Sequence, residues 1–131
     1  MAHLTIQHSL SLSTRHDMTA LCEALRRTMI AQGCFPVGGI RVRAWPTPAE
    51  AIADGHPDNA YADMVLRLGA GRSADLKHAA GEALMATAED FFAQELTSPH
   101  FALALEIVEI DAELSWKTNS IHARLKAESQ Q

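Results

Sequence analysis

Apolar residues near the start of the chain follow two different periods. In residues 3–8, Leu4 and Ile6 fall on one face, the two-residue period of a half-buried strand. Residues 17–32 instead place apolar side chains at helical spacing, which predicts an amphipathic helix. A second strand is predicted over residues 40–45, directly after a pair of glycines. Together these segments form one strand-helix-strand unit.

Capping and turn residues mark the ends of these elements. Asp17 suits the start of the helix, because its side chain can accept a hydrogen bond from a free backbone N–H. Gly33 suits the end of the helix, with Pro36 shortly beyond it. Residues 46–59 carry three of the five prolines, and predict a mostly irregular crossover with one helical turn around residues 49–53.

The same order of elements then repeats. Residues 60–68 predict a strand, and residues 69–72 predict a turn. Ser73 suits the start of a helix that runs to about Leu96. Residues 101–110 predict the most apolar strand of the chain.

The spacing of the two units indicates an internal duplication within one domain of 131 residues. Their first strands are offset by roughly 58 residues. Repeat one covers about residues 1–59 and repeat two about residues 60–110, and a C-terminal tail follows over residues 111–131. The tail contains a short helical pattern at Ile121 and Leu125.

These elements predict an α+β fold of two layers, built from tandem β-α-β repeats. Each crossover within one sheet should be right-handed, which places both helices on one face of a four-stranded sheet. The last strand is apolar on both faces, since Leu103, Leu105 and Ile107 alternate with residues such as Ala104 and Val108. We therefore expect another copy of the chain to cover the open face.

Composition narrows the class of protein. Hydrophobic residues make up 47% of the chain and charged residues 21%, which is typical of a globular domain. The net charge of −5 argues against a nucleic-acid partner, because phosphates require a basic surface. Two cysteines are too few for a disulfide framework, and neither a leader pattern nor a long apolar run is present. We expect a cytoplasmic protein with no membrane partner.

Three arginines are candidates for binding an anion. Arg72 lies at the predicted start of a helix, where backbone N–H groups and the helix dipole favour a carboxylate or phosphate. Arg41 and Arg43 are two residues apart on a strand and so point the same way. An ordinary turn and a solvated sheet face are the alternatives for these positions. The turn Gly69-x-Gly71 lacks the acidic partner and the further strands of a dinucleotide-binding fold.

The seven histidines show no metal-ligand spacing. His3 and His8 fall on opposite faces of their strand. The histidines that stand alone in the sequence are His56, His78, His100 and His122. We therefore predict no metal site.

Several short blocks together resemble one family. In chain order these blocks are His3-Leu4, Gly33-Cys34-Phe35-Pro36, Gly39-Ile40-Arg41-Val42-Arg43, Leu68-Gly69-Ala70-Gly71-Arg72-Ser73 and Asn119-Ser120-Ile121-His122-Ala123. Over nearly its whole length the chain is similar to 5-carboxymethyl-2-hydroxymuconate isomerases of the tautomerase superfamily. The resemblance implies a homotrimer with active sites near the subunit boundaries. It also implies a cofactor-free 1,3 proton shift in an unsaturated oxo-dicarboxylate from aromatic catabolism.

The resemblance assigns the general base to the second residue. The family begins Met-Pro and uses the secondary amine of the proline after loss of Met, whereas this chain has Ala2. A free α-amine has a pKa of about 7.7 to 8.0, which nearby arginines would lower, so an Ala2 amine can act as a base near neutral pH. The implied catalytic residues are Ala2, Arg41 and Arg72, and the implied substrate-binding residues are Arg43, Phe35 and Trp116.

Two functions from different classes follow from this departure. One is an isomerase or tautomerase that acts on a small dicarboxylate. The other is a catalytically inactive trimer of the tautomerase fold that binds small organic anions, because the cyclic amine is absent.

Overall fold

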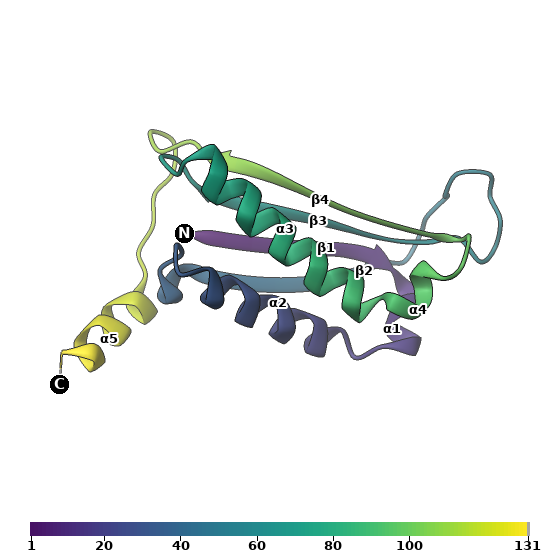
Figure 1. Ribbon diagram of the computed structural model, residues 1–131, viewed down its shortest axis with the longest axis horizontal. Helices are drawn as coiled ribbons and strands as arrows, with labels where there is room; N and C mark the ends of the chain where they lie inside the picture. The colour runs from purple at the N-terminus through teal and green to yellow at the C-terminus, as the bar shows by residue number, and fades with distance from the viewer. Residues whose placement is uncertain (131) are drawn as a thin grey trace.

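The four predicted strands and both long helices are confirmed in the computed structural model, which describes residues 1–130 and contains further short helical segments that the pattern did not predict (Figure 1). The strands are β1 (Ala2–Ser9), β2 (Ile40–Thr47), β3 (Ala60–Gly69) and β4 (Phe101–Ile110). The helical segments are α1 (Leu10–Arg15), α2 (Met18–Gln32), the 3-10 turn η1 (Val37–Gly39), α3 (Ala74–Phe91), α4 (Ala93–Leu96) and α5 (Ser120–Ser129).

The sheet joins the two repeats through their first strands. Its strand order is β2-β1-β3-β4, with β1 parallel to β2, β3 parallel to β4, and β1 antiparallel to β3. In this register Leu4 lies between Val42 and Leu66. The strand that begins at the second residue of the chain is therefore an inner strand of the sheet.

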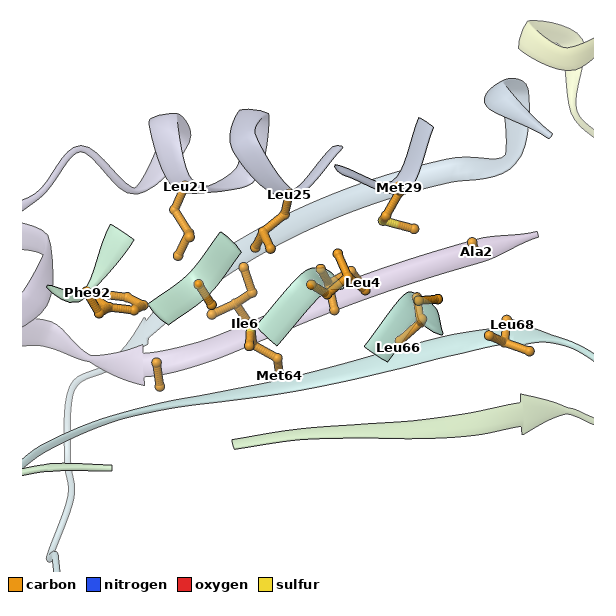
Figure 2. Close-up of a cluster of buried hydrophobic side chains, with 14 of the residues drawn as sticks. Ala2, Leu4, Ile6, Leu21, Leu25, Met29, Met64, Leu66, Leu68 and Phe92 are labelled. Atoms are coloured by element: carbon orange, nitrogen blue, oxygen red, sulfur yellow. The ribbon is translucent and has the colours of Figure 1, made fainter. Parts of the chain in front are cut away.

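Both long helices cover the same face of the sheet, as predicted (Figure 1). From α2, the side chains of Leu21, Leu25 and Met29 point toward Leu4 and Ile6 of β1 (Figure 2). All five are fully buried, and burying one such side chain contributes roughly 1.5–3 kcal/mol relative to leaving it exposed. No helix in residues 1–130 is both long and apolar enough to cross a bilayer.

The opposite face of the sheet is open in the single chain. On β2 this face carries Arg41, Arg43 and Trp45, all of them exposed, and on β4 it carries the exposed Ala102 and Ala104. Small apolar side chains on an outer strand and an exposed tryptophan form a surface that another molecule can cover.

The residues at the ends of the two long helices cap them as the sequence predicts. The Asp17 carboxylate accepts a hydrogen bond from the Thr19 N–H, and the Ser73 hydroxyl accepts one from the Leu76 N–H. Gly33 ends α2 in the left-handed region at φ 74°, which a residue with a side chain rarely adopts.

The crossover between β2 and β3 differs from its prediction. Residues 48–59 form bends and turns, so the prediction of a helical turn at residues 49–53 is wrong. Ala53 has a φ of 51°, and this left-handed conformation does not continue a right-handed helix. A hydrogen bond of 2.9 Å from the Gly55 N–H to the Ile52 carbonyl closes a tight turn instead.

The predicted helix to Leu96 is interrupted at Phe92. The ring of Phe92 is fully buried and lies 5.0 Å from the Phe91 ring and 5.1 Å from the Phe101 ring, measured between centroids. Its backbone adopts φ −96° and ψ 23°, which separates α3 from α4. Packing of this aromatic cluster therefore decides where the helix ends, and periodicity alone did not predict it.

A hydrogen-bonded pair joins the connection before α2 to the short helix α4. The His16 Nε2 lies 2.7 Å from the Glu95 Oε1, and the Arg15 Nη1 lies 3.8 Å from the other carboxylate oxygen. Glu95 is only 5% exposed, so its carboxylate depends on these partners. The pair holds the first repeat against the second.

We expect His16→Ala to lower the free energy of unfolding by about 1.5–3 kcal/mol, because it leaves a buried carboxylate with one distant partner. Urea unfolding followed by circular dichroism measures the change. Arg27→Ala is the matched control, since its ion pair with Glu23 is exposed to solvent and such pairs contribute little to stability. An equally small effect of both substitutions would show that the buried pair does not hold the repeats together.

Candidate functional site

Three segments meet at the start of β1. Ala2 pairs with Ile40 at the start of β2 and with Leu68 near the end of β3. This register brings residues 33–39 and 69–73 to the N-terminus, which Figure 1 marks with N. The sheet therefore gathers at one corner the blocks that are separated in the sequence.

Met1 lies in this corner in a fixed position. Its carbonyl oxygen accepts a hydrogen bond of 3.1 Å from the Gly69 N–H. A Cβ on Gly39 would lie 3.2 Å from the Met1 Cα, so glycine permits this close approach. The Arg41 guanidinium donates toward the Met1 sulfur, with 3.9 Å between Nη2 and Sδ. The terminal amine is thus positioned by the sheet.

Arg72 ties two of the segments together. Its Nε and Nη2 donate to the Cys34 carbonyl at 3.2 and 3.1 Å, and its Nη1 donates to the Gly69 carbonyl at 3.0 Å. The guanidinium lies 5.1 Å from the centroid of the buried Phe35 ring, within the range of a cation–π contact. A guanidinium has five N–H donors, so these three bonds leave two for another acceptor.

The C-terminal tail closes the corner through Asn119. The Asn119 Nδ2 donates to the Gly38 carbonyl at 2.8 Å, and its Oδ1 accepts from the His122 N–H at 2.9 Å, which caps α5. A Cβ on Gly38 would lie 2.6 Å from the His122 Cα, so only glycine allows α5 to approach this closely. The capping amide therefore also anchors the tail.

Two cavities adjoin the terminal residue. One, of about 310 Å³, is lined by Met1, Pro36, Gly39, Lys117, Asn119 and His122. The other, of about 220 Å³, is lined by Met1, Gly69, Ala70, Ile110, Ala112, Ser115 and Lys117. Met1 and Lys117 line both cavities, so both spaces adjoin the terminal residue.

The environment favours the neutral form of the terminal amine. Burial lowers the pKa of the Met1 amine, and the positive charges of Lys117 and Arg72 lower it further. A larger fraction of the amine is therefore unprotonated near neutral pH, and an unprotonated amine can accept a proton.

The structure brings some of the predicted residues together and separates others. Ala2 is fully buried behind Met1, while Arg41, Arg72 and Phe35 adjoin the corner. Arg43 is exposed and lies two residues further along β2. Trp116 is 83% exposed in the single chain.

The sequence did not identify Lys117 as a neighbour of the amine. It lies in the irregular segment between β4 and α5, where no periodicity predicts a direction. The only signal was its position two residues before the Asn119 block.

A larger cavity of about 600 Å³ lies between α3 and β4. Its lining combines apolar side chains such as Leu105 and Ile107 with Lys77 and Glu109, which form an ion pair of 2.7 Å. Lys77 and Glu109 of this groove are paired with each other, and the groove lies away from the terminal amine, so we place the candidate site at the smaller cavities beside the amine.

The expectation that the histidines stand apart is wrong for two of them. The rings of His56 and His100 stack with a centroid distance of 4.0 Å. The irregular crossover brings His56 against His100, the residue directly before β4. Sequence spacing does not show such a contact.

A duplicated β-α-β sheet with the chain's own terminal amine set among cationic side chains defines a protein of the tautomerase class. A family model for 5-carboxymethyl-2-hydroxymuconate isomerase matches residues 2–125, and the chain belongs to this family. The resemblance predicted from short sequence blocks is thereby confirmed.

Individual relatives agree with this assignment. The 5-carboxymethyl-2-hydroxymuconate Delta-isomerase of Escherichia coli is 35% identical over 126 residues, which cover 96% of this chain and 100% of the relative. The crystal structure of a 5-carboxymethyl-2-hydroxymuconate isomerase from Deinococcus radiodurans R1 has a TM-score of 0.88 at 37% identity, covering 95% of this chain and 93% of that chain. A wild-type fused 4-OT symmetric trimer shares the fold, with a TM-score of 0.63 at 16% identity over 88% of this chain and 93% of that chain.

On the open face of the sheet, next to the corner, lies the buried His3. It pairs with Arg41 on one side and Arg67 on the other, and no described residue hydrogen-bonds to its buried Nε2. Burial lowers the pKa of His3 to about 4, and the charges of Arg41, Arg43 and Arg67 and of the terminal amine lower it in the same direction. The imidazole is therefore neutral at neutral pH.

We expect this imidazole to destabilise the protein in acid. The unfolded chain binds a proton at His3 below about pH 6.5, whereas the folded chain does so only near pH 4. Stability should therefore fall as the pH drops from 6.5 to 4 and change no further from this group below that range. NMR titration of the His3 ring measures the folded pKa, and urea unfolding of His3→Gln should show a shallower fall. A folded midpoint near pH 6.5 would contradict this expectation.

Proposed function

We propose that this chain catalyses a cofactor-free 1,3 proton shift in an unsaturated oxo-dicarboxylate of the 5-carboxymethyl-2-hydroxymuconate type. The observation that carries the proposal is the position of the terminal residue, which lines two cavities and whose amine lies near the charges of Lys117 and Arg72. Membership of the isomerase family supports the reaction class.

The reaction needs one group that both removes and returns a proton. The neutral amine nitrogen accepts a proton from the carbon next to the carbonyl, and the electron pair of the broken C–H bond forms a dienolate with its negative charge on oxygen. The protonated amine then delivers the proton to the carbon two positions along, and the double bond shifts accordingly. A lowered amine pKa favours the first step.

Cationic side chains around the corner suit the dicarboxylate and the dienolate. Arg72 presents two N–H donors beyond those that hold the Cys34 and Gly69 carbonyls. Arg41 is exposed beside Met1, and Lys117 lines both cavities. Charge-assisted hydrogen bonds from such groups bind carboxylates and stabilise the developing oxyanion.

Met1 lines both cavities, and its loss would enlarge the space beside the new terminal residue. The terminal amine would then belong to Ala2 and would move by roughly 3.3 Å, the rise of one residue in a strand. In the family pattern this position is a proline, whose ring fixes the direction of the nitrogen lone pair. Ala2 supplies the amine without that constraint, so we propose that this chain turns over its substrate slowly.

We also propose that the active unit is a homotrimer. The open sheet face carries exposed small apolar residues, and Trp116, Leu114 and Ile121 near the site are 83%, 71% and 55% exposed in the single chain. In such a trimer a partner chain would cover the open face and bury Trp116, which could then form an apolar wall of the site. The fused 4-OT of the same fold is a symmetric trimer, which supports this assembly.

The substitution Ala2→Pro tests the proposal directly. With Met1 removed, the ring restores a positioned secondary amine, and we expect turnover to rise by at least about 10²-fold, the usual contribution of a positioned general base. Ultraviolet absorbance of a 2-hydroxymuconate-type dienol follows the reaction. Intact mass confirms loss of Met1, and light scattering confirms that parent and variant have the same trimeric mass.

A variant that has lost Met1, assembles normally and still shows no proton exchange at the substrate carbon by NMR would contradict the isomerase proposal. Binding of a dicarboxylate by that same variant would then identify the protein as an anion-binding trimer.

The two exposed arginines of β2 form a matched pair for the binding step. We expect Arg41→Ala to weaken dicarboxylate binding or turnover by about 1.5–3 kcal/mol, the range for a hydrogen bond to a charged group. Arg43→Ala should cost less, because Arg43 lies roughly 6.6 Å further from the amine along the strand. Calorimetry with a dicarboxylate measures both, and equal losses would instead give Arg43 the direct substrate contact that the family resemblance implies.

A further inference from the structure

Three side chains that can bind a metal ion meet at the end of the sheet opposite to the N-terminus. His56 and Asp58 belong to the crossover between β2 and β3, and His100 directly precedes β4 (Figure 1). One ligand atom from each, a ring nitrogen or a carboxylate oxygen, lies within 4.8 Å of the other two. The distance suits a group of ligands that can close around one ion with small side-chain movements.

Asn59 orients the His100 ring. Its Nδ2 donates to the Ile52 carbonyl at 3.1 Å and to the Asp54 carboxylate at 2.8 Å, so its Oδ1 faces the imidazole. This oxygen lies 3.1 Å from the His100 Nδ1, which therefore carries the hydrogen. The lone pair of His100 is then on Nε2. Metal-binding histidines usually donate their other ring N–H to such an oxygen, which fixes the ring for the ion.

The backbone already holds the three residues near one another. The Asn59 N–H donates to the His56 carbonyl at 3.0 Å, and the Ala60 N–H donates to the His100 carbonyl at 2.8 Å. The crossover is thus attached to the start of β4 without an ion. Less conformational entropy is lost on binding when the ligands are held in this way.

We propose that His56, Asp58 and His100 bind one divalent transition-metal ion of the zinc type, with water in the remaining positions. Two imidazoles and one carboxylate are ligands that zinc, cobalt and nickel accept. Magnesium and calcium prefer sites made of oxygen atoms, so this group selects against them. This proposal departs from the prediction, drawn from spacing alone, that the histidines hold no metal.

Binding changes the contacts of His56 most. Its Nδ1 accepts a hydrogen bond of 3.1 Å from the Asp58 N–H, and its ring stacks on His100. His56 is exposed, so its ring can turn toward the ion and give up these contacts. His100 keeps its bond to Asn59. The ion then joins residues 48–59 to the start of β4 and stabilises the folded chain.

The site is separate from the proposed isomerase chemistry. The ten residues of β3 run from Ala60 beside this cluster to Gly69 beside Met1, so the two places lie roughly 30 Å apart. Binding of an ion here and turnover at the amine can therefore be measured independently.

Titration of the full-length, tag-free protein with Zn²⁺ and Co²⁺ tests the proposal. We expect one ion per chain by calorimetry, a visible absorption band with Co²⁺, and a thermal midpoint that rises with Zn²⁺ and not with Mg²⁺. His56→Gln and His100→Gln should each weaken binding by at least about tenfold. His78→Gln, which removes an exposed histidine of α3, is the matched control and should leave the affinity unchanged.

Two results would overturn the proposal. In the first, the ion binds the parent and both ligand variants with equal affinity, or His78→Gln loses as much affinity as the ligand variants do. Either outcome would assign binding to scattered surface histidines. A ratio of one ion to two chains would place the ion between copies. Circular dichroism of each variant confirms that the fold is intact, so a loss of affinity reports the ligands themselves.

Discussion

The pairing of β1 along both of its edges is the interaction on which the rest of the structure depends. Leu4 and Ile6 are fully buried on the helix-covered face, and the strand forms a ladder with β2 on one side and β3 on the other. A slip of one residue would turn both side chains to the open face and His3 into the apolar core. The register is therefore strongly specified, and with it the place of the terminal residue.

One set of positive charges serves two purposes at the end of this strand. Lys117 and Arg72 lower the pKa of the terminal amine, and in the proposed reaction side chains of the same charge would attract an anionic substrate. The chain as a whole carries a net charge of −5, so this local excess comes from placement and not from composition. Burial strengthens both effects, because charges interact more strongly where water is partly excluded.

The two β-α-β units share a topology but place different side chains at opposite ends of the sheet. At one end the terminal residue, the Arg72 turn and the tail meet, because β1 starts where β3 ends. At the other end the irregular crossover meets the residue before β4, because β3 and β4 run parallel and start together. The two β-α-β units thus have unlike surroundings, since the connections and tail that surround the sheet differ.

The sequence by itself determined the elements whose signals are local. Alternation and helical spacing predicted the four strands and both long helices, and Asp17 and Ser73 marked the helix starts because a capping hydrogen bond spans only two or three residues. The family also followed from short blocks. Only the tertiary structure decided the break at Phe92, the approach of Lys117 to the amine and the meeting of His56 with His100. Each of these depends on packing between segments far apart in the chain, and neither period nor spacing encodes such contacts.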